Sequence, residues 1–307
     1  MKIKIGTRGS KLALWQADYI QSRLKAAEIS SEIIVIETKG DKILDRALSK
    51  IGSKGVFTEE LEDQLHSGDI DIAVHSAKDL QSDLGNDLEI IAFTEREKTC
   101  DVLISLNQSL KVATDKSITI GTSSTRRVAM LKAYFPNVNI VDMRGNLQTR
   151  IKKMESGVCD ALMLAYAGVH RMKYNEMIVH EFDENEMVPP VGQGTVAIEI
   201  SKNLDPSKAE AIRSACNDPE TEKCLLTERS FLKEINGGCS IPVFGNAVLE
   251  KDKIVFKAGI ISLNGQEKVF VEKTQTNETP EELGKLVAVE ILANGGKEIL
   301  ETIKSQL

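Results

Sequence analysis

Arginine is sparse in this chain, and five of its arginines crowd into one stretch of the middle. They are Arg126, Arg127, Arg144, Arg150 and Arg171. The first two stand in the first turn of an expected helix, just after Gly121-Thr122-Ser123-Ser124, where cations oppose the helix dipole. A bound anion would reverse that cost, because backbone amides and guanidinium groups would converge on it. Surface arginines paired with local acids are the alternative.

Two further turns have the same arrangement of a strand end, an arginine beside glycine, and a residue that caps a helix. They read Gly6-Thr7-Arg8-Gly9-Ser10 and Arg144-Gly145-Asn146. Neither turn carries the dinucleotide pattern GxGxxG or the P-loop pattern GxxxxGK[ST]. Three such helix starts indicate a ligand with several negative groups, and carboxylates suit them at least as well as phosphates.

A lysine and an aspartate, Lys78 and Asp79, follow directly after the apolar run 71–74, which is expected to be a buried strand. In open α/β sheets ligands bind at the carboxyl ends of the strands. The adjacent ammonium keeps Asp79 ionised, so its carboxylate could stabilise positive charge that develops on an N–H donor. An aspartate that only satisfies turn amides is the structural alternative.

Cys239 lies in the glycine-rich turn Asn236-Gly237-Gly238-Cys239-Ser240. A thiol in such a turn is accessible and could act as a nucleophile or as a covalent attachment point, whereas most lone cysteines only pack. The five cysteines include no CxxC pair, and the four histidines have no ligand spacing, so neither a disulfide framework nor a metal site is predicted.

The elements that would position these residues alternate between strand and helix. Strands are expected at 2–5, 32–38, 71–74 and 88–93, with helices after Ser10 and Thr58. The pattern then repeats, with strands at 117–121, 138–141 and 159–164 and helices at 123–134, 146–154 and 165–172. Two βαβ-rich halves predict two similar domains with mainly parallel sheets and a ligand cleft between them.

The last third has a different pattern. Helices are expected at 206–216, 219–232 and 280–293, the last ended by Asn294-Gly295-Gly296, and three alternating strands at 243–249, 254–261 and 268–276. This order predicts a smaller α+β domain with an antiparallel sheet. The segment 41–54 between Gly40 and Gly52 is either a lid or an ordinary surface loop.

Charge and hydropathy exclude two classes of protein. A net charge of −7 and a pI near 5.4 argue against a nucleic-acid binder. No apolar run has the roughly 18 residues that a membrane span needs, and the first residues lack a signal peptide's apolar stretch. We therefore expect a cytoplasmic protein without a membrane partner.

Seven motifs occur together in this order. They are GTRGSKLALWQA (6–17), HSAKDL (75–80), GTSSTRR (121–127), RGNLQTR (144–150), LAYAGVHR (164–171), VGQG (191–194) and GGCSIPV (237–243). With them the chain resembles the porphobilinogen deaminase, or hydroxymethylbilane synthase, family. Leu80-Gln81, Thr125 and Ser240 depart from the usual family pattern, but they flank the chemistry without replacing it.

The resemblance implies two domains like periplasmic binding proteins, at 1–95 plus 195–213 and at 99–190, and a C-terminal α+β domain at 217–307. It implies a transferase of haem biosynthesis that joins four porphobilinogen molecules on a dipyrromethane primer, releases ammonia and frees a linear tetrapyrrole by hydrolysis. The implied partner is porphobilinogen, with no nucleic acid or membrane, and the implied state is a monomer. A non-catalytic anion-binding protein of the periplasmic-receptor type is the rival hypothesis.

The resemblance also implies roles for individual residues. Asp79 would be catalytic, and Cys239 would carry the dipyrromethane through a thioether. The residues that would bind the cofactor are Lys78, Ser76, Thr122, Ser123, Ser124, Arg126 and Arg127. Those that would bind substrate are Arg8, Ser10, Gln16, Arg144, Arg150, Arg171, Gln193 and Lys54. The segment 41–54 resembles the family's mobile loop over the cleft.

Overall fold

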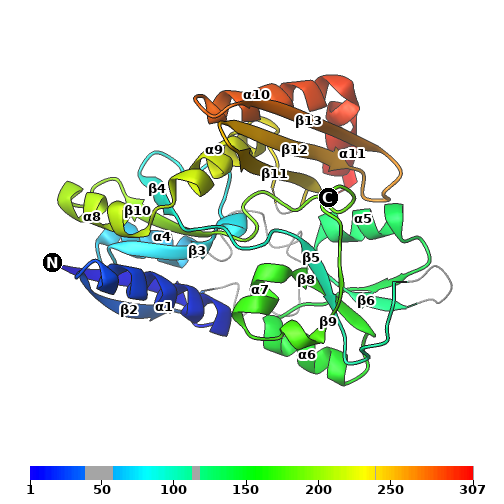
Figure 1. Cartoon of the computed structure of the whole chain (residues 1–307), viewed down its shortest axis with the longest axis horizontal. Coiled ribbons are helices and arrows are strands. Elements are labelled where there is room, and N and C mark those ends of the chain that lie inside the picture. Colours follow the sequence, from blue (N-terminus) through cyan, green and yellow to red (C-terminus); the bar gives the residue numbers. More distant parts are fainter. Residues whose placement is uncertain (39–57, 113–117, 239, 307) are drawn as a thin grey trace.

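The chain folds around three β-sheets, which lie in three lobes (Figure 1). The structure is a computed structural model, and it describes residues 1–38, 58–112, 118–238 and 240–306. Two lobes hold five-stranded mixed sheets, and the third holds a three-stranded antiparallel sheet.

The first sheet has the strand order β2-β1-β3-β10-β4. Its strands are β1 (Lys2–Arg8), β2 (Ser30–Ile36), β3 (Ile72–Ser76), β4 (Leu88–Phe93) and β10 (Val196–Ser201). Helices α1 (Lys11–Ala26) and α8 (Pro206–Cys216) pack against one face through a core that includes Ile3, Ile5 and Ile72. Helix α4 (Glu59–Ser67) covers the other face, and the short 3-10 turn η1 (Ala77–Asp79) follows β3 directly.

The second sheet has the strand order β7-β6-β8-β5-β9. Its strands are β5 (Asp101–Ile104), β6 (Thr119–Gly121), β7 (Asn139–Val141), β8 (Ala161–Ala165) and β9 (Ile178–Glu181). Helices α5 (Thr125–Tyr134), α6 (Leu147–Glu155) and α7 (Tyr166–Arg171), with the 3-10 turn η2 (Asn175–Met177), complete this lobe. Strand β6 is parallel to β7 and β8, as a βαβ pattern predicts.

One strand is reversed in each of these two sheets. Strand β10 is antiparallel to β3 and β4, and β5 is antiparallel to β8 and β9. Each reversed strand directly follows a crossing between the sheets, because β4 leads to β5 through residues 94–100 and β9 leads to β10 through residues 182–195. The two five-stranded sheets therefore have equivalent strand orders and are joined by two crossing segments.

The third sheet consists of β11 (Val243–Glu250), β12 (Lys253–Ile261) and β13 (Lys268–Thr276) in antiparallel order. Helices α9 (Pro219–Glu234) and α10 (Pro280–Ile291) pack against it, with Phe231 of α9 edge-on to Phe256 of β12. Its apolar core continues to Ala77 and Leu80 of the first lobe. The third lobe thus packs directly behind the turn that carries Lys78 and Asp79.

The predicted architecture is confirmed: two α/β domains with equivalent strand orders and a smaller α+β domain with three antiparallel strands. The short strands β5, β9 and β10 were not in the element pattern. The predicted helix stop at Asn294-Gly295-Gly296 is confirmed, since Gly295 has φ 101°, but the helix α11 (Lys297–Gln306) that follows it was not in the pattern. The domain boundaries stay a prediction.

Candidate active site

The first group of predicted site residues lies at the carboxyl edge of the first sheet. Strand β1 ends at Arg8, and the neighbouring parallel strand β3 ends at Ser76. Parallel neighbours end at the same edge, so the turn after β3 brings Lys78 and Asp79 to the edge where Arg8 and Ser10 lie. The sequence order of these residues gave no sign of this proximity beyond the strand pattern.

A small cavity of about 70 Å³ at this edge collects most of the first group. Ser10 caps α1 by accepting a hydrogen bond from the Ala13 amide at 3.2 Å. The buried Gln16 donates from Nε2 to Ser76 Oγ at 2.9 Å, which joins α1 to β3. Asp79 is exposed and lines the cavity, so its carboxylate can reach a ligand there. The full lining is Arg8, Ser10, Leu12, Ala13, Gln16, Thr58, Val74, His75, Ser76 and Asp79.

The second group begins at the turn between β6 and α5. Ser123 Oγ donates to the Met143 carbonyl at 2.6 Å and accepts from the Met143 amide at 3.1 Å, which fixes the turn to the end of β7. The buried Thr122 accepts from the Ser124 amide at 3.3 Å. Ser124 is the N-cap of α5, and its hydroxyl makes no capping bond within the described chain. The Ser124 hydroxyl and the helix start are therefore available to an anion.

Arg126 and Arg127 are buried, and one carboxylate holds both of them. Asp101, the first residue of β5, accepts from Arg126 Nη2 at 2.5 Å and from Arg127 Nη2 at 2.8 Å. Arg126 also donates to the Val188 carbonyl, and Arg127 donates to the Met163 carbonyl, each at 3.0 Å. The two arginines are thus neither surface residues nor paired with a local acid.

The charge state of Asp101 follows from this contact. Burial alone would raise the pKa of its carboxyl, but Arg126 and Arg127 outweigh burial and hold the pKa well below its usual range. The carboxylate is therefore ionised at neutral pH and offsets one of the two guanidinium charges. One positive charge of this triad is left without a partner inside it.

Lys78 reaches the same region from the first sheet. Its Nζ donates to the side-chain oxygen of Gln193 at 3.2 Å. Burial, followed by the charge of Arg127, lowers the pKa of Lys78 to about 8, and Asp79 and Asp101 offset only part of that shift. The ammonium therefore lies among cations and has no carboxylate hydrogen-bonded to it in the part of the chain that the structure describes.

Arg144 and Arg150 add two more positive charges from the second sheet. Arg150 donates from Nε to the Gly145 carbonyl at 2.7 Å. Its pKa falls to about 10 through burial and the charge of Arg127, with a further contribution from Arg144, while carboxylates that include Asp79 oppose the shift. Nη1 of Arg144 is buried and has no hydrogen-bond partner in the described ranges. Both arginines have hydrogen-bonding capacity left for a ligand.

Arg171 is placed between the two sheets. Its guanidinium lies over the ring of Trp15, 5.1 Å from the centroid, and Trp15 in turn stacks on Tyr19. Its Nη2 donates to the Gly194 carbonyl at 2.7 Å. Burial lowers the pKa of the guanidinium. Arg171 therefore joins α7 to α1 and to the second crossing segment.

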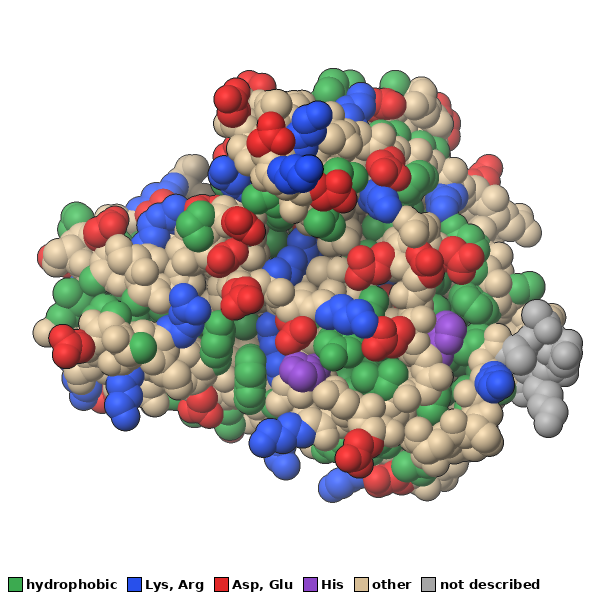
Figure 2. All heavy atoms as spheres, viewed as in Figure 1, with side chains coloured by type: hydrophobic (Ala, Val, Ile, Leu, Met, Phe, Trp, Pro, Cys, Tyr) green, Lys and Arg blue, Asp and Glu red, His purple; other side chains and the backbone are tan. Residues whose placement is uncertain are grey.

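Positive charge gathers between the first two lobes, since Lys78 comes from the first sheet and Arg127 and Arg150 come from the second, whereas basic and acidic side chains are interspersed on the face drawn in Figure 2. The cations lower one another's pKa, and a buried guanidinium nitrogen lacks a described partner. This repulsion would be relieved by an anion with several negative groups, since each group could accept bonds from two or more of the cations. The arrangement can thus hold a polycarboxylate beside the exposed carboxylate of Asp79.

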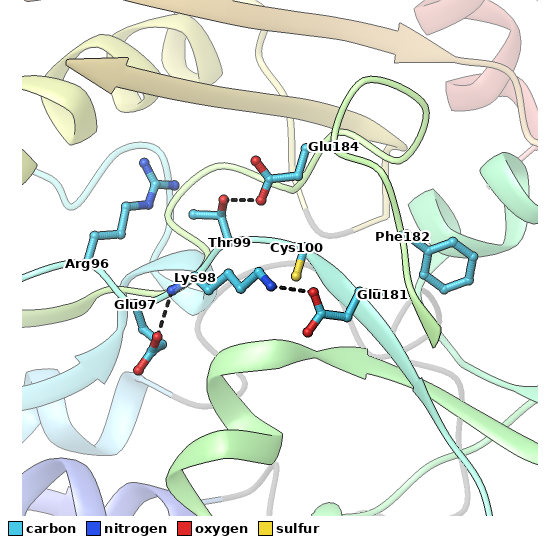
Figure 3. Close-up of a pocket in the computed structure, with 8 residues that line it drawn as sticks. All are labelled: Arg96, Glu97, Lys98, Thr99, Cys100, Glu181, Phe182 and Glu184. Carbon is cyan, nitrogen blue, oxygen red and sulfur yellow. Dashed lines mark hydrogen bonds and ion pairs between the residues drawn. The ribbon is translucent and has the colours of Figure 1, made fainter. Parts of the chain in front are cut away.

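A larger cavity of about 400 Å³ lies on the crossing segments rather than at this cluster (Figure 3). Lys98 contacts Glu181 across it, and Thr99 donates to Glu184 at 2.5 Å. Lys98 and Glu181 thus pair with each other, whereas Arg96 pairs with Glu228, which does not line the cavity. None of the predicted site residues lines this cavity, so size alone does not mark the active site here.

Two of the predicted residues, Cys239 and Lys54, lie outside the described residues, as does the whole segment 41–54. The other four cysteines are buried free thiols. Among the described residues no group of histidine, cysteine and acidic side chains could hold a metal ion.

Sequence reasoning missed three residues that organise the site: Asp101, Arg96 and Glu228. Arg96 donates from Nη1 to Glu228 Oε1 at 2.6 Å, and Glu228 is fully buried. The only sign of Asp101 in the sequence is that a charged residue begins the otherwise apolar run Asp101–Ile104. Such a charge inside a fully buried strand needs a partner, which the sequence does not identify.

The fold and the cation cluster together define a class: an α/β protein with two sheets of equivalent strand order and a cluster of cations between them that can hold a small, multiply charged anion. Comparisons with known proteins refine this class. Residues 3–209 match the family model described as porphobilinogen deaminase, dipyromethane cofactor binding domain. Residues 222–293 match the model of the porphobilinogen deaminase C-terminal domain.

Curated relatives agree over the whole length. A porphobilinogen deaminase of Desulfosudis oleivorans is 48% identical over 100% of this chain and 99% of its own. One of Cytophaga hutchinsonii is 50% identical over 99% of this chain and 98% of its own. Among solved structures, the VFT2 domain of Bordetella pertussis BvgS is similar with a TM-score of 0.45 and 14% identity, over 75% of this chain and 92% of that one. The chain belongs to the porphobilinogen deaminase family.

Proposed function

We propose that the chain is a hydroxymethylbilane synthase. It joins four porphobilinogen molecules head to tail on a dipyrromethane primer, loses ammonia at each addition and releases the linear tetrapyrrole by hydrolysis. The family match supports the reaction class. The observation that carries the proposal is the exposed carboxylate of Asp79 at the rim of a cluster of unneutralised cations from two sheets.

Asp79 is the proposed catalytic group. As ammonia leaves the aminomethyl carbon of porphobilinogen, positive charge spreads over the pyrrole ring and its N–H. A fixed carboxylate that accepts a hydrogen bond from this N–H stabilises the charge as it develops. The incoming carbon then bonds to the growing chain, and the ring carbon that was attacked loses its proton. This role is supported by the position of Asp79, which is exposed and lines the small cavity.

The cations are the proposed binding groups. Each pyrrole unit carries an acetate and a propionate, so a growing chain adds two carboxylates per unit, which arginine binds bidentately. Arg8, Ser10 and Gln16 would hold incoming substrate at the first sheet. Arg144, Arg150 and Arg171 would hold carboxylates from the second sheet.

The dipyrromethane fits the same cluster, because its four carboxylates match the excess of positive charge and the buried Arg144 nitrogen that has no described partner. When bound, it supplies the free pyrrole carbon at which the chain grows. Cys239 is the proposed thioether anchor. Lys78 and Ser124 would hold its carboxylates, with Ser76, Thr122, Ser123, Arg126 and Arg127 shaping the same pocket.

Intact mass tests the anchor. The denatured protein should carry the added mass of two linked pyrrole units, and a Cys239→Ser variant should lack it. Unmodified chain in both samples, even after incubation with porphobilinogen, would overturn the assignment and favour the rival hypothesis of a non-catalytic anion-binding protein.

Turnover tests the catalytic role. Asp79→Asn should nearly abolish tetrapyrrole formation with the fold retained, because an amide cannot stabilise the developing charge as a carboxylate does. Asp83→Asn is the matched control, since Asp83 is an exposed aspartate four residues on that does not line the cavity. Rates in Asp79→Asn equal to those of the control would sink the mechanism.

We further propose that the protein acts as a cytoplasmic monomer with the domain boundaries given by the resemblance. No helix in the described ranges is long and apolar enough to cross a membrane. Light scattering of the purified chain and limited proteolysis at the crossing segments would test the monomer and the boundaries.

A further inference from the structure

The second crossing segment contains a glutamine whose side chain is fully enclosed. Gln193 has no exposed surface. Its Nε2 donates to the Thr99 carbonyl at 2.7 Å and to Asp101 Oδ1 at 2.9 Å, and its Oε1 accepts from Lys78 Nζ at 3.2 Å. Both N–H groups of the amide are therefore occupied, and the oxygen is engaged. No polar atom of the side chain is left for a substrate.

The backbone around Gln193 is held just as firmly. Arg96 donates from Nε to the Gln193 carbonyl at 2.9 Å, and the Gly192 amide donates to Glu228 Oε2 at 2.7 Å. Glu228 also accepts from the Ala247 amide of β11 at 2.7 Å. The glutamine thus lies at a junction to which all three lobes contribute, and its position is set independently of any ligand.

The contacts of Gln193 need an amide in particular. Lys78 offers only donors, and Asp101 offers only acceptors, so the side chain between them must accept on one side and donate on the other. A glutamate would suit Lys78 but would place a second carboxylate against Asp101. A methionine of similar size would satisfy neither neighbour. Glutamine is the residue of this length that meets both demands.

These contacts form one continuous chain across the cleft. It runs from the turn that carries Lys78 and Asp79, through Gln193, to Asp101 and the two arginines that Asp101 holds. We propose that Gln193 is a positioning residue that fixes the Lys78–Asp79 turn of one sheet relative to the Asp101–Arg126–Arg127 cluster of the other, in place of the direct substrate contact implied by the resemblance. This inference rests on the proposed function, because the distance between the Lys78–Asp79 turn and the arginine cluster matters only if a ligand held by one reacts at the other.

The spacing matters because the reacting carboxylate and the arginines belong to different sheets. A ligand held by the second sheet must present its reacting carbon to Asp79 on the first. A misplacement of about 1 Å between such groups can lower a rate by roughly a hundredfold. Gln193 would act on the reaction through this distance without touching the substrate.

The test follows the Lys78 ammonium directly in the full-length holoenzyme. Lysines are reductively methylated with ¹³C-formaldehyde, the Lys78 signal is assigned by its loss in Lys78→Arg, and its titration is followed by NMR. The variants are Gln193→Glu and Gln193→Met, with Gln108→Glu as the control for the same change of charge at an exposed site. Circular dichroism and intact mass confirm that each variant is folded and loaded.

We expect the two variants to differ in the pKa of Lys78. Gln193→Glu should raise the pKa of Lys78 by about one unit or more, because it puts a carboxylate against the ammonium. Gln193→Met should lower it or leave it unchanged, and should slow chain growth about ten- to hundredfold. The control should move neither quantity. The isosteric glutamate variant keeps the test valid if the methionine variant does not fold.

The outcomes also separate this proposal from the proposed function. An unmoved Lys78 titration in Gln193→Glu, in an enzyme that makes tetrapyrrole, overturns the positioning role alone. Full catalytic rate in a folded Gln193→Met variant overturns it as well. The expected shifts in a protein that does not consume porphobilinogen would leave the contact intact and refute the activity.

Discussion

Replacing Asp101 by asparagine should strongly destabilise the fold, because this carboxylate is the only described acid that holds the two buried arginines. Its Oδ1 accepts from Arg127 and Gln193, and its Oδ2 accepts from Arg126. An asparagine offers one oxygen, so its NH₂ group would face at least one of these donors. Two buried guanidinium charges would then lack any counter-charge in the triad.

The expected cost is about 3–5 kcal/mol, the usual loss when one partner of a buried ion pair is removed. Glu181→Gln is the matched control. It also neutralises one acid of an ion pair, but Lys98 and Glu181 are exposed by 48% and 42%, and exposed pairs contribute less than about 1 kcal/mol. Comparing the two variants separates the cost of leaving buried charges unpaired from the cost of losing one charge at the surface.

Urea unfolding monitored by circular dichroism measures both costs, provided that the slopes of the variants agree with that of the parent chain. The direction in which the free energy of unfolding changes with pH gives a second check. Because the pKa of Asp101 is lowered by folding, its stabilisation is fully present above the ordinary carboxyl pKa of about 3.9 and is lost as pH falls below it. The difference between parent and Asp101→Asn should stay constant from about pH 5 to 8. A cost for Asp101→Asn no larger than that for Glu181→Gln would refute the reasoning.

Three further predictions concern single positions. Arg144→Leu should leave the unfolding midpoint nearly unchanged but stall chain growth, since Nη1 of Arg144 is buried without a described partner. Native gels would then show enzyme with one to three added pyrroles. Normal elongation in this variant would contradict the proposed role of Arg144. Gly192→Ala should lower the melting temperature more than Gly68→Ala. Both glycines have a positive φ (78° and 76°), so the backbone strain of the two variants is similar. A Cβ at Gly192 would lie 2.7 Å from the Lys78 amide nitrogen, whereas a Cβ at Gly68 would meet no atom within 4 Å. Equal melting temperatures would show that this contact is unimportant. Burial raises the pKa of the thiols of Cys100, Cys216 and Cys224 to about 11. Iodoacetamide at pH 7 should therefore label these three thiols only after unfolding. Rapid labelling of the folded protein, measured by mass spectrometry, would count against their burial.

Local signals were read correctly from the sequence. Ser10 and Asn146 were expected to cap helices, and both do so through side-chain bonds, from the Ala13 and Thr149 amides respectively. Capping depends on residues within one turn of each other, so a single sequence contains the information. The same holds for β11, β12 and β13, whose alternation and turns are local.

Non-local features could not be read in this way. Strands β5, β9 and β10 are four to six residues long. Strands β5 and β10 belong to the sheet that the chain has just entered, and β9 pairs with the distant β5, which no local pattern indicates. The partner of Arg126 and Arg127 on helix α5 is Asp101, which precedes them by 25 and 26 positions on strand β5. Gln193 looked like one residue of a tight turn, because its contacts come from both sheets.

The charge cluster has an energetic consequence that links folding to ligand binding. Lys78 of η1, Arg127 of α5 and Arg150 of α6 come from separate elements, and the fold brings them together although they repel one another. The pKa of Lys78 falls from its ordinary 10.5 to about 8, which corresponds to a cost of up to about 3 kcal/mol for keeping the ammonium charged. Because folding lowers this pKa, the cost is fully present below pH 8 and disappears as pH rises from 8 towards 10.5.

Packing and the Gln193 junction must therefore hold the cations in place before any ligand arrives. Lys78 is attached to Ala77, which belongs to the core that the third lobe shares with the first, and to Gln193 at the crossing segment. A polycarboxylate that enters the cluster removes the repulsion, so part of its binding free energy appears as added stability of the fold. The third lobe and the crossing segments are thus as necessary to the site as the arginines, since they supply the energy that keeps like charges together.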